Sequence, residues 1–208
     1  MRNQEIDKAR LFIYNLLSLL FVENHAKSEV KEIKKSLKLL EQNSFDDDVS
    51  EAARVIVQNL ESGSDEDIYV EYQELFLVPF SSFISLSASY YYEQREGGMM
   101  LLKVRDILAR TKIRKDESSF SAPEDHFGFI FTLATYLIDQ EMQDESDALL
   151  YKSLQKELFE AVINPFCDEI AYKMMSSETK IYSNVGAILG NFCNFERAYL
   201  DVTKIKAA

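Results

Sequence analysis

The side chains best placed to do chemistry are Asp125 and His126, at the end of a short polar segment. A neighbouring carboxylate and imidazole can act as an acid–base pair, and an aspartate can also accept hydrogen bonds from arginine. Ser121 with Glu124 three residues later fits a capping box, with Pro123 in the first helical turn. Capping requires neither Asp125 nor His126, so these two residues are candidates for a function. The structural alternative is that the His126 ring packs against the next turn of the helix.

The rest of the sequence offers this pair no catalytic partner. His25 is the only other histidine, and no nucleophile elbow, metalloprotease or phosphate-binding motif occurs. Cys167 and Cys193, the only cysteines, lie in apolar contexts without CxxC spacing, which predicts buried thiols rather than a nucleophile, a metal site or a disulfide. We therefore expect no enzyme; the enzymatic alternative is an Asp125–His126 pair acting on a nucleotide.

Acidic residues dominate the stretch from residue 46 to residue 74, where Arg54 is the only base. Helix starts and solvated faces account for most clusters of this kind. The functional alternative is a landing face for arginine side chains, which form charge-assisted hydrogen bonds with carboxylates. The ten acidic residues are Asp46, Asp47, Asp48, Glu51, Glu61, Asp65, Glu66, Asp67, Glu71 and Glu74.

A set of aromatic residues follows in the same part of the chain. Most aromatic stripes belong to a core, but a loop rich in aromatics beside a helix can also form an apolar groove for a peptide helix. Both interpretations remain open for Tyr69, Tyr72, Phe76, Phe80, Phe83, Tyr90, Tyr91 and Tyr92.

The formal net charge of −12 narrows the class of partner. Such a surface repels phosphate backbones, which argues against nucleic acid, and it suits either solubility or a cationic peptide. The apolar run Leu11–Val22 is too short to span a bilayer, and Glu5 and Asp7 are unlike the start of a secretory signal. We expect a cytoplasmic protein without stable membrane insertion.

Helices must position these residues, because apolar residues recur at helical spacing and glycine and proline are few. We predict an all-α fold, a single helical bundle domain over residues 1–208 with about nine helices. Residues 79–89 are predicted to be an ordered loop, and Lys112–Ser121 a surface loop or a hinge between two helical halves. The helices are expected at about residues 4–22, 28–41, 46–62, 65–76, 99–111, 123–142, 147–162, 165–176 and 181–204.

Several motifs in chain order resemble the TorD/DmsD/NarJ family of redox enzyme maturation chaperones, which assemble molybdoenzymes. Tyr72–Pro79 followed by Ser89–Tyr91 resembles the family signature YxxLFxxP…S-x-Y, and Pro123–His126, which opens an apolar helix, resembles its E/P-x-D-H motif. The likeness covers nearly the whole chain. Its weaker parts, also in the expected order, are Arg10–Phe21, Met99–Leu108, Asn164–Phe166 and Tyr182–Tyr199.

The resemblance implies a helical chaperone for the apo catalytic subunit of a molybdopterin oxidoreductase. It would bind the twin-arginine signal peptide of that subunit, or another segment, so that cofactor is inserted before export. It needs no cofactor of its own, although some relatives bind guanine nucleotides or the molybdenum cofactor transiently. Asp125 would accept hydrogen bonds from arginine, and His126 would donate one or respond to pH. Tyr72, Leu75, Phe76 and Pro79 would form an apolar wall, and Tyr91 completes the client-binding set.

The sequence departs from the family pattern at Leu86–Ala88, where many relatives have a proline, an aromatic residue and a glutamate, and at Ile130, where a glutamate is frequent. These changes place the chain on a divergent branch, and the client enzyme is not identified. The alternative function is a helical scaffold that binds an unrelated partner helix. The Lys112–Ser121 hinge would also permit exchange of helices between two chains.

Overall fold

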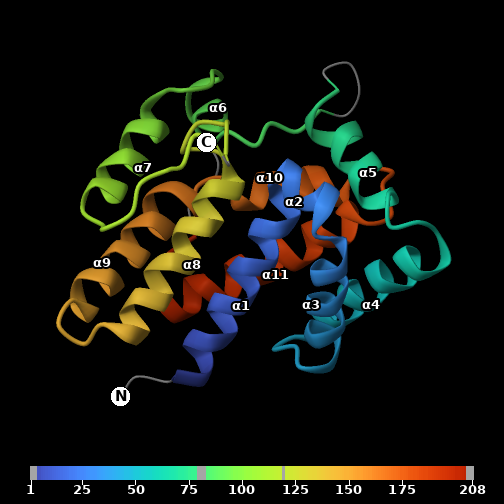
Figure 1. Cartoon of the computed structure of the whole chain (residues 1–208), viewed down its shortest axis with the longest axis horizontal. Coiled ribbons are helices and arrows are strands. Elements are labelled where there is room, and N and C mark those ends of the chain that lie inside the picture. The colour runs from blue at the N-terminus through green and yellow to red at the C-terminus, as the bar shows by residue number, and fades with distance from the viewer. Residues whose placement is uncertain (1–3, 79–82, 119, 205–208) are drawn as a thin grey trace. The chain divides into compact units, whose positions relative to one another are not determined.

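The computed structural model describes residues 4–78, 83–118 and 120–204, and its elements are helices (Figure 1). This confirms the predicted all-α fold. The elements in chain order are α1 (Gln4–Phe21), α2 (Glu23–Ser28), α3 (Val30–Gln42), α4 (Asp47–Ser62), α5 (Asp67–Phe76), α6 (Ala88–Glu93), α7 (Met99–Ala109), α8 (Phe127–Gln143), α9 (Ala148–Leu158), the π-helical turn η1 (Phe159–Ile163), α10 (Cys167–Met175) and α11 (Tyr182–Leu200).

The start of α8 differs most from its prediction. The capping box at Ser121 and Glu124 does not form; the N-cap is His126, whose Nδ1 accepts a hydrogen bond from the Gly128 N–H at 3.1 Å. The connector before α6, residues 83–87, explains the shift together with the first residue of α6. The Ala88 N–H donates to the Asp125 carbonyl, and the Phe127 N–H donates to the carbonyl of Leu86. These bonds hold His126 extended after a turn at Glu124 and Asp125, so the helix begins only afterwards.

Two short helices were not predicted. The backbone is extended at Val22, which ends α1 and allows α2 to begin a new direction. In the aromatic segment Ala88–Glu93 forms α6, which ends at Gln94 in the left-handed conformation. Part of the predicted loop at residues 79–89 lies outside the described residues.

The chain forms two compact units. Unit 1 draws its residues from Met1–Ser18, Leu86–Phe166 and Lys204–Ala208, and unit 2 from Leu19–Ser85 and Cys167–Thr203. The segment Lys112–Ser121 lies inside unit 1, not at a boundary between units. The single-domain organisation and the hinge stay predictions.

Unit 1 is built on α8, α9 and η1, with α6 and α7 packed beside them. A polar network lies within its core: Arg10 Nη1 donates to Asp7 Oδ1 at 3.3 Å and to Gln155 Oε1 at 3.0 Å. Gln155 Nε2 in turn donates to Glu141 Oε2 at 2.8 Å. Each of these four side chains is buried, so charge is compensated inside the unit rather than by water.

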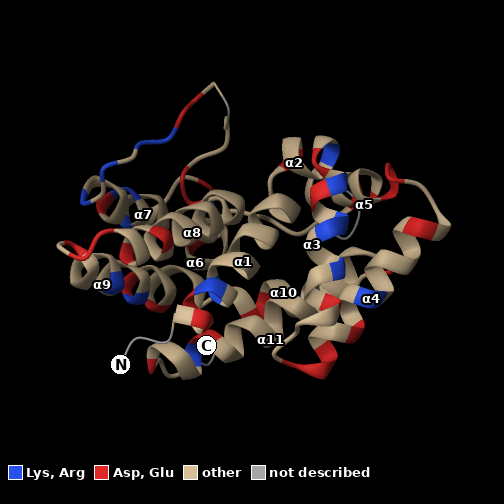
Figure 2. Cartoon of the chain, turned by 60° about the horizontal axis from the view of Figure 1, so that its bottom comes forward, with Lys and Arg blue, Asp and Glu red and all other residues tan. Residues whose placement is uncertain are grey.

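Unit 2 is built on the antiparallel packing of α10 on α11, with α3, α4 and α5 completing the core (Figure 1). Basic residues of α3 pair with acidic residues at the end of α4 and beyond it, as the blue and red segments of Figure 2 indicate. Lys38 Nζ lies 2.6 Å from Glu61 Oε1, and Lys34 Nζ lies 2.6 Å from Asp65 Oδ1. Part of the acidic stretch is therefore neutralised within the unit.

Glycine brings α10 and α11 close together. A Cβ built on Gly186 would lie 2.8 Å from the Ala171 carbonyl oxygen and 2.9 Å from Met174 Cβ, whereas one on Gly190 would meet Ala171 Cβ at 3.5 Å, an ordinary contact. The close approach at Gly186 thus depends on the missing side chain.

Gly186→Ala is expected to lower the free energy of unfolding by about 1–3 kcal/mol, because backbone must move to admit the methyl group. Gly190→Ala is the matched control. It is expected to be neutral or to stabilise by up to about 1 kcal/mol, from the better helix propensity of alanine. Urea unfolding followed by circular dichroism measures both, and equal effects at the two positions would contradict the packing described.

Candidate functional site

Helix α5 carries the tyrosine–leucine–phenylalanine motif on its buried face. Tyr72, Leu75 and Phe76 are all in the core of unit 2. Tyr72 Oη donates to the Phe21 carbonyl at 3.3 Å, and burial raises the pKa of this phenol well above its ordinary value. The Phe76 ring stands edge-on to Tyr182 at 5.2 Å. These contacts fix the orientation of α5. Pro79, the last residue of the predicted motif, lies outside the described residues.

The opposite face of α5 is exposed and mixes apolar with acidic residues. Val70, Glu74 and Leu77 follow at i, i+4 and i+7 spacing, so they lie on one side of the helix. Val70 is 48% exposed, and Leu77 and the following Val78 are each 43% exposed. We call Val70, Glu74, Leu77 and Val78 the α5 face. Exposed apolar residues grouped in this way are typical of an interaction surface.

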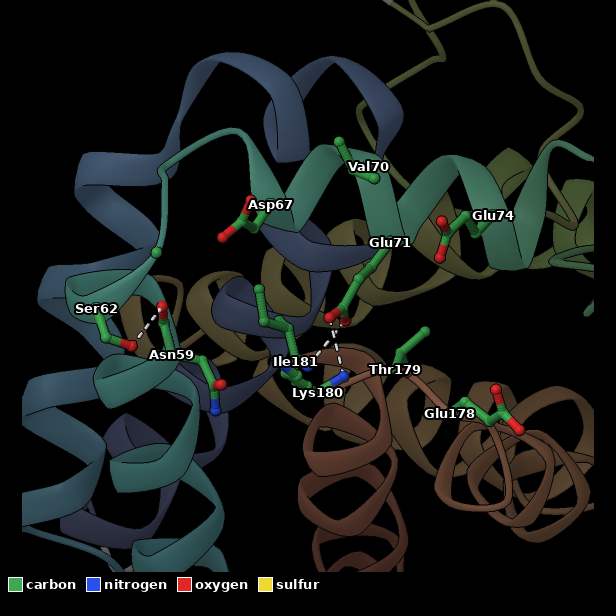
Figure 3. Close-up of a pocket in the computed structure, with 11 residues that line it drawn as sticks. Asn59, Ser62, Asp67, Val70, Glu71, Glu74, Glu178, Thr179, Lys180 and Ile181 are labelled. Atoms are coloured by element: carbon green, nitrogen blue, oxygen red, sulfur yellow. Dashed lines mark hydrogen bonds between the residues drawn. The ribbon is translucent and has the colours of Figure 1, made fainter.

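A hollow of about 440 Å³ in unit 2 adjoins this face (Figure 3). Figure 3 shows that α5 forms one side of it, with the end of α4 and the segment before α11 around the rest. We call it the acidic pocket, because four carboxylates line it and Lys180 is the one basic residue among its described lining. The lining residues are Asn59, Ser62, Gly63, Asp67, Val70, Glu71, Glu74, Glu178, Thr179, Lys180 and Ile181.

Glu71 has a structural role in the acidic pocket. Its carboxylate accepts hydrogen bonds from the backbone N–H groups of Lys180 and Ile181 at 2.9 and 2.8 Å (Figure 3), and from that of Tyr182 at 3.0 Å. An anion at the start of α11 compensates the positive end of the helix dipole. Asp67 Oδ2 similarly accepts from the Ser64 N–H at 2.8 Å. Two of the four carboxylates thus hold the walls in place, while Glu74 and Glu178 are exposed at the opening.

Asp125 lies in unit 1 and is fully buried. Its Oδ2 accepts from Ser87 Oγ at 2.8 Å and from the Ser89 N–H at 3.1 Å, which ties the connector before α6 to the start of α8. Its Oδ1 is buried without a hydrogen-bond partner among the described residues. Asp125 therefore joins two segments of unit 1 and, in this conformation, presents no surface to a client.

His126 is held beside Asp125 as a neutral imidazole. Burial lowers the pKa of His126 to about 4, and the negative charge of Asp125 only partly opposes this shift. The Phe120 ring stands edge-on to the imidazole at 5.4 Å between centroids. Because Nδ1 accepts from a backbone N–H, the ring must be neutral at that nitrogen, which fits the low pKa.

Tyr91 is half-buried in unit 1 and belongs to its aromatic packing. Its ring stacks on Phe166 at 6.0 Å and meets Phe127 edge-on at 6.5 Å. Six of the seven predicted site residues are described by the structure, and they fall into two groups. Unit 2 contains Tyr72, Leu75 and Phe76, and unit 1 contains Tyr91, Asp125 and His126. Their role in binding a client stays a prediction.

Val70 and Leu77, on the side of α5 that faces solvent, were not predicted as site residues. The family resemblance selected the buried residues of the motif, although Val70 and Leu77 share i, i+4, i+7 spacing with Glu74, a member of the predicted acidic landing face. Glu71 gave no local signal, because its helix-capping partners lie more than 100 residues away along the chain.

Other site types find no support in the described part of the chain. No group of three or more histidine, cysteine or acidic side chains there is arranged to hold a metal ion. No helix in it combines the length and apolar content needed to cross a membrane.

A family model matches more than half of the chain. Residues 42–171, well over half of the chain, match the family model described as nitrate reductase delta subunit. The matched region includes α5, the connector before α6 and the start of α8. No curated protein and no solved structure matches the chain.

Proposed function

Because the chain belongs to the nitrate reductase delta subunit family, a family of molybdoenzyme assembly chaperones of the NarJ/TorD type, we propose that it binds a basic, apolar segment of its client. The client is the apo catalytic subunit of a molybdopterin oxidoreductase, and the segment is its N-terminal twin-arginine signal. The chaperone acts in the cytoplasm, without catalysis, and holds the client until cofactor has been inserted.

The α5 face is the observation that carries this proposal. It places three exposed apolar side chains beside Glu74 and next to a pocket with further carboxylates. A twin-arginine signal combines guanidinium groups with an apolar stretch, so it complements both parts of this surface. Guanidinium groups form charge-assisted hydrogen bonds with carboxylates, and the net charge of −12 accelerates the approach of a cationic peptide.

The buried motif has a positioning role in this proposal. Tyr72, Leu75 and Phe76 fix one side of α5 in the core of unit 2, and thereby orient the residues on the other side. In unit 1, Tyr91 and His126 are partly exposed and are proposed as further client contacts. Asp125 holds the start of α6, the helix that carries Tyr91. Pro79 remains a proposed contact in the segment that follows α5.

Calorimetric titration of the full chain with a synthetic twin-arginine leader peptide tests the proposal. We expect a dissociation constant of about 1 μM or tighter, and weaker binding at higher salt because exposed charges are screened. The double variant Glu74→Gln/Glu178→Gln keeps side-chain size and removes two negative charges at the mouth of the acidic pocket. Its affinity is expected to fall about tenfold, roughly 1.4 kcal/mol.

The matched control is Glu96→Gln/Glu145→Gln, which removes two exposed negative charges from unit 1. It has the same net charge as the test variant. Equal losses of affinity in the two variants would therefore show general electrostatic attraction rather than a specific binding site. A wild-type chain that does not bind the leader at all would contradict the proposed function itself.

A further inference from the structure

The two cysteines meet where α10 packs on α11, in a buried cluster that the proposed function does not use. Cys167 is 0% exposed and Cys193 2%, and neither forms a disulfide in this structure. Arg197 Nη2 donates to Cys167 Sγ at 3.1 Å and to Asp168 Oδ2 at 3.0 Å, while its Nη1 donates to Asp168 Oδ1 at 3.1 Å. A buried thiol ordinarily packs as a small apolar side chain and needs no charged partner, so the guanidinium at hydrogen-bond distance from Cys167 is not explained by packing alone.

The register of the two helices places the cysteines opposite each other. Gly186 lies against Met174 and Gly190 against Ala171, so moving one further turn along α11 brings Cys193 level with Cys167. Burial raises the pKa of the Cys193 thiol, and the nearby Cys167 side chain adds to this shift. A disulfide needs Cα atoms within about 4.4–6.8 Å, and the glycines allow the close helix approach that this requires.

We infer that Cys167 and Cys193 form a redox-responsive pair that closes to a disulfide when a peroxide oxidises the protein, cross-linking α10 to α11 within unit 2. This inference concerns the chain itself and does not depend on the identity or binding of any client.

The reaction proceeds in two balanced steps. The sulfur of Cys167 attacks one oxygen of hydrogen peroxide, the O–O bond breaks, a sulfenic acid forms, and the thiol proton leaves with the departing hydroxide as water. The sulfur of Cys193 then attacks that of Cys167, the S–O bond breaks, and the second thiol proton leaves with hydroxide as water. Two electrons pass from the cysteines to the peroxide.

The surroundings assign the two roles. Arg197 stabilises the negative charge that develops on Cys167 during the first step, because its guanidinium donates directly to that sulfur. Burial raises the pKa of Cys193 well above its ordinary value, so Cys193 keeps its proton until a sulfenic acid is available. Both sulfurs are buried, and a small oxidant reaches them through local opening of the helices.

The experiment exposes the folded full chain to hydrogen peroxide, quenches the oxidant, unfolds the protein and alkylates the remaining thiols before intact-mass and peptide mass spectrometry. We expect a monomer lighter by two hydrogen atoms, unalkylated at both cysteines, with one peptide pair joined through Cys167 and Cys193. The cross-link should also raise the thermal unfolding midpoint by several degrees, an increase that a reducing agent reverses.

Two variants separate the roles. Cys193→Ser should leave Cys167 as a sulfenic acid or a more oxidised form, with no increase in the unfolding midpoint. Arg197→Gln should slow disulfide formation about tenfold, the loss expected for one charge-assisted hydrogen bond. Arg54→Gln, at a partly exposed site in the same unit, is the control and should react as the wild type does.

Three results would overturn the inference. These are two thiols that stay fully alkylatable after treatment, two cysteines that oxidise independently to sulfinic acids, and cross-links found only between chains. An Arg197→Gln variant that folds, as circular dichroism reports, and oxidises at the wild-type rate would overturn the role given to the guanidinium.

Discussion

Replacing Arg10 with methionine is expected to lower the free energy of unfolding by about 3–5 kcal/mol, the largest single-residue effect predicted for this chain. Arg10 is 1% exposed, and its partner Asp7 is fully buried. Methionine has a similar length but no charge, so Asp7 would keep a buried negative charge without its cation. Gln155, which links Arg10 to Glu141, would also lose a donor to its Oε1.

Urea unfolding at neutral pH measures this loss. Lys8→Met is the matched control, since Lys8 lies in the same helix and pairs at 2.8 Å with Glu5, with both side chains largely exposed. An exposed pair of this kind contributes about 0–1 kcal/mol. If Arg10→Met proves no more destabilising than Lys8→Met, the polar network of unit 1 does not hold its core together.

The second large effect is a pH dependence that comes from His126. Its pKa falls from an ordinary 6.5 to about 4 in the folded chain, because burial disfavours the charged ring. The unfolded chain therefore binds a proton between these values while the folded chain does not, and stability falls as pH drops through this window. The cost attributable to His126 is expected to be about 2 kcal/mol by about pH 5, relative to about pH 7.5.

His126→Asn isolates this contribution. Asparagine is a good N-cap and does not titrate, so it should retain the stability of α8 near neutral pH and lose less stability on acidification. His126→Ala removes the cap as well, and should cost about 1 kcal/mol throughout the range. Parallel acid-induced losses in the wild type and in His126→Asn would mean that the histidine is protonated in the folded state.

Local patterns were sufficient to predict most of the helices. Asp46, which was predicted at the start of α4, is an example, and the structure confirms its place. Its Oδ1 accepts hydrogen bonds from the Asp48 and Val49 N–H groups at 2.9 and 3.3 Å. Such contacts span only a few residues and follow from residue type. Buried thiols at Cys167 and Cys193 were likewise predictable from their apolar contexts, and the structure confirms their burial.

The sequence was insufficient where the partners of a residue are distant along the chain. The predicted capping box at Ser121 does not form, because hydrogen bonds from the segment before α6, some 40 residues earlier, fix Asp125 and hold His126 extended. The client-binding prediction selected Tyr72, Leu75 and Phe76, since the family motif names the residues that packing requires. It passed over Val70 and Leu77, whose exposure depends on which side of α5 the core of unit 2 covers.

Photo-crosslinking of a leader peptide to the full chain tests the central claim most directly. The peptide carries a photoreactive residue beside its two arginines, and mass spectrometry locates the joined residues. We predict links to Val70, Glu74 or Leu77 on the α5 face, competed by unlabelled leader and reduced in Glu74→Gln/Glu178→Gln. Specific, competed links confined to residues of unit 1 would contradict the assignment of the client-binding surface to α5.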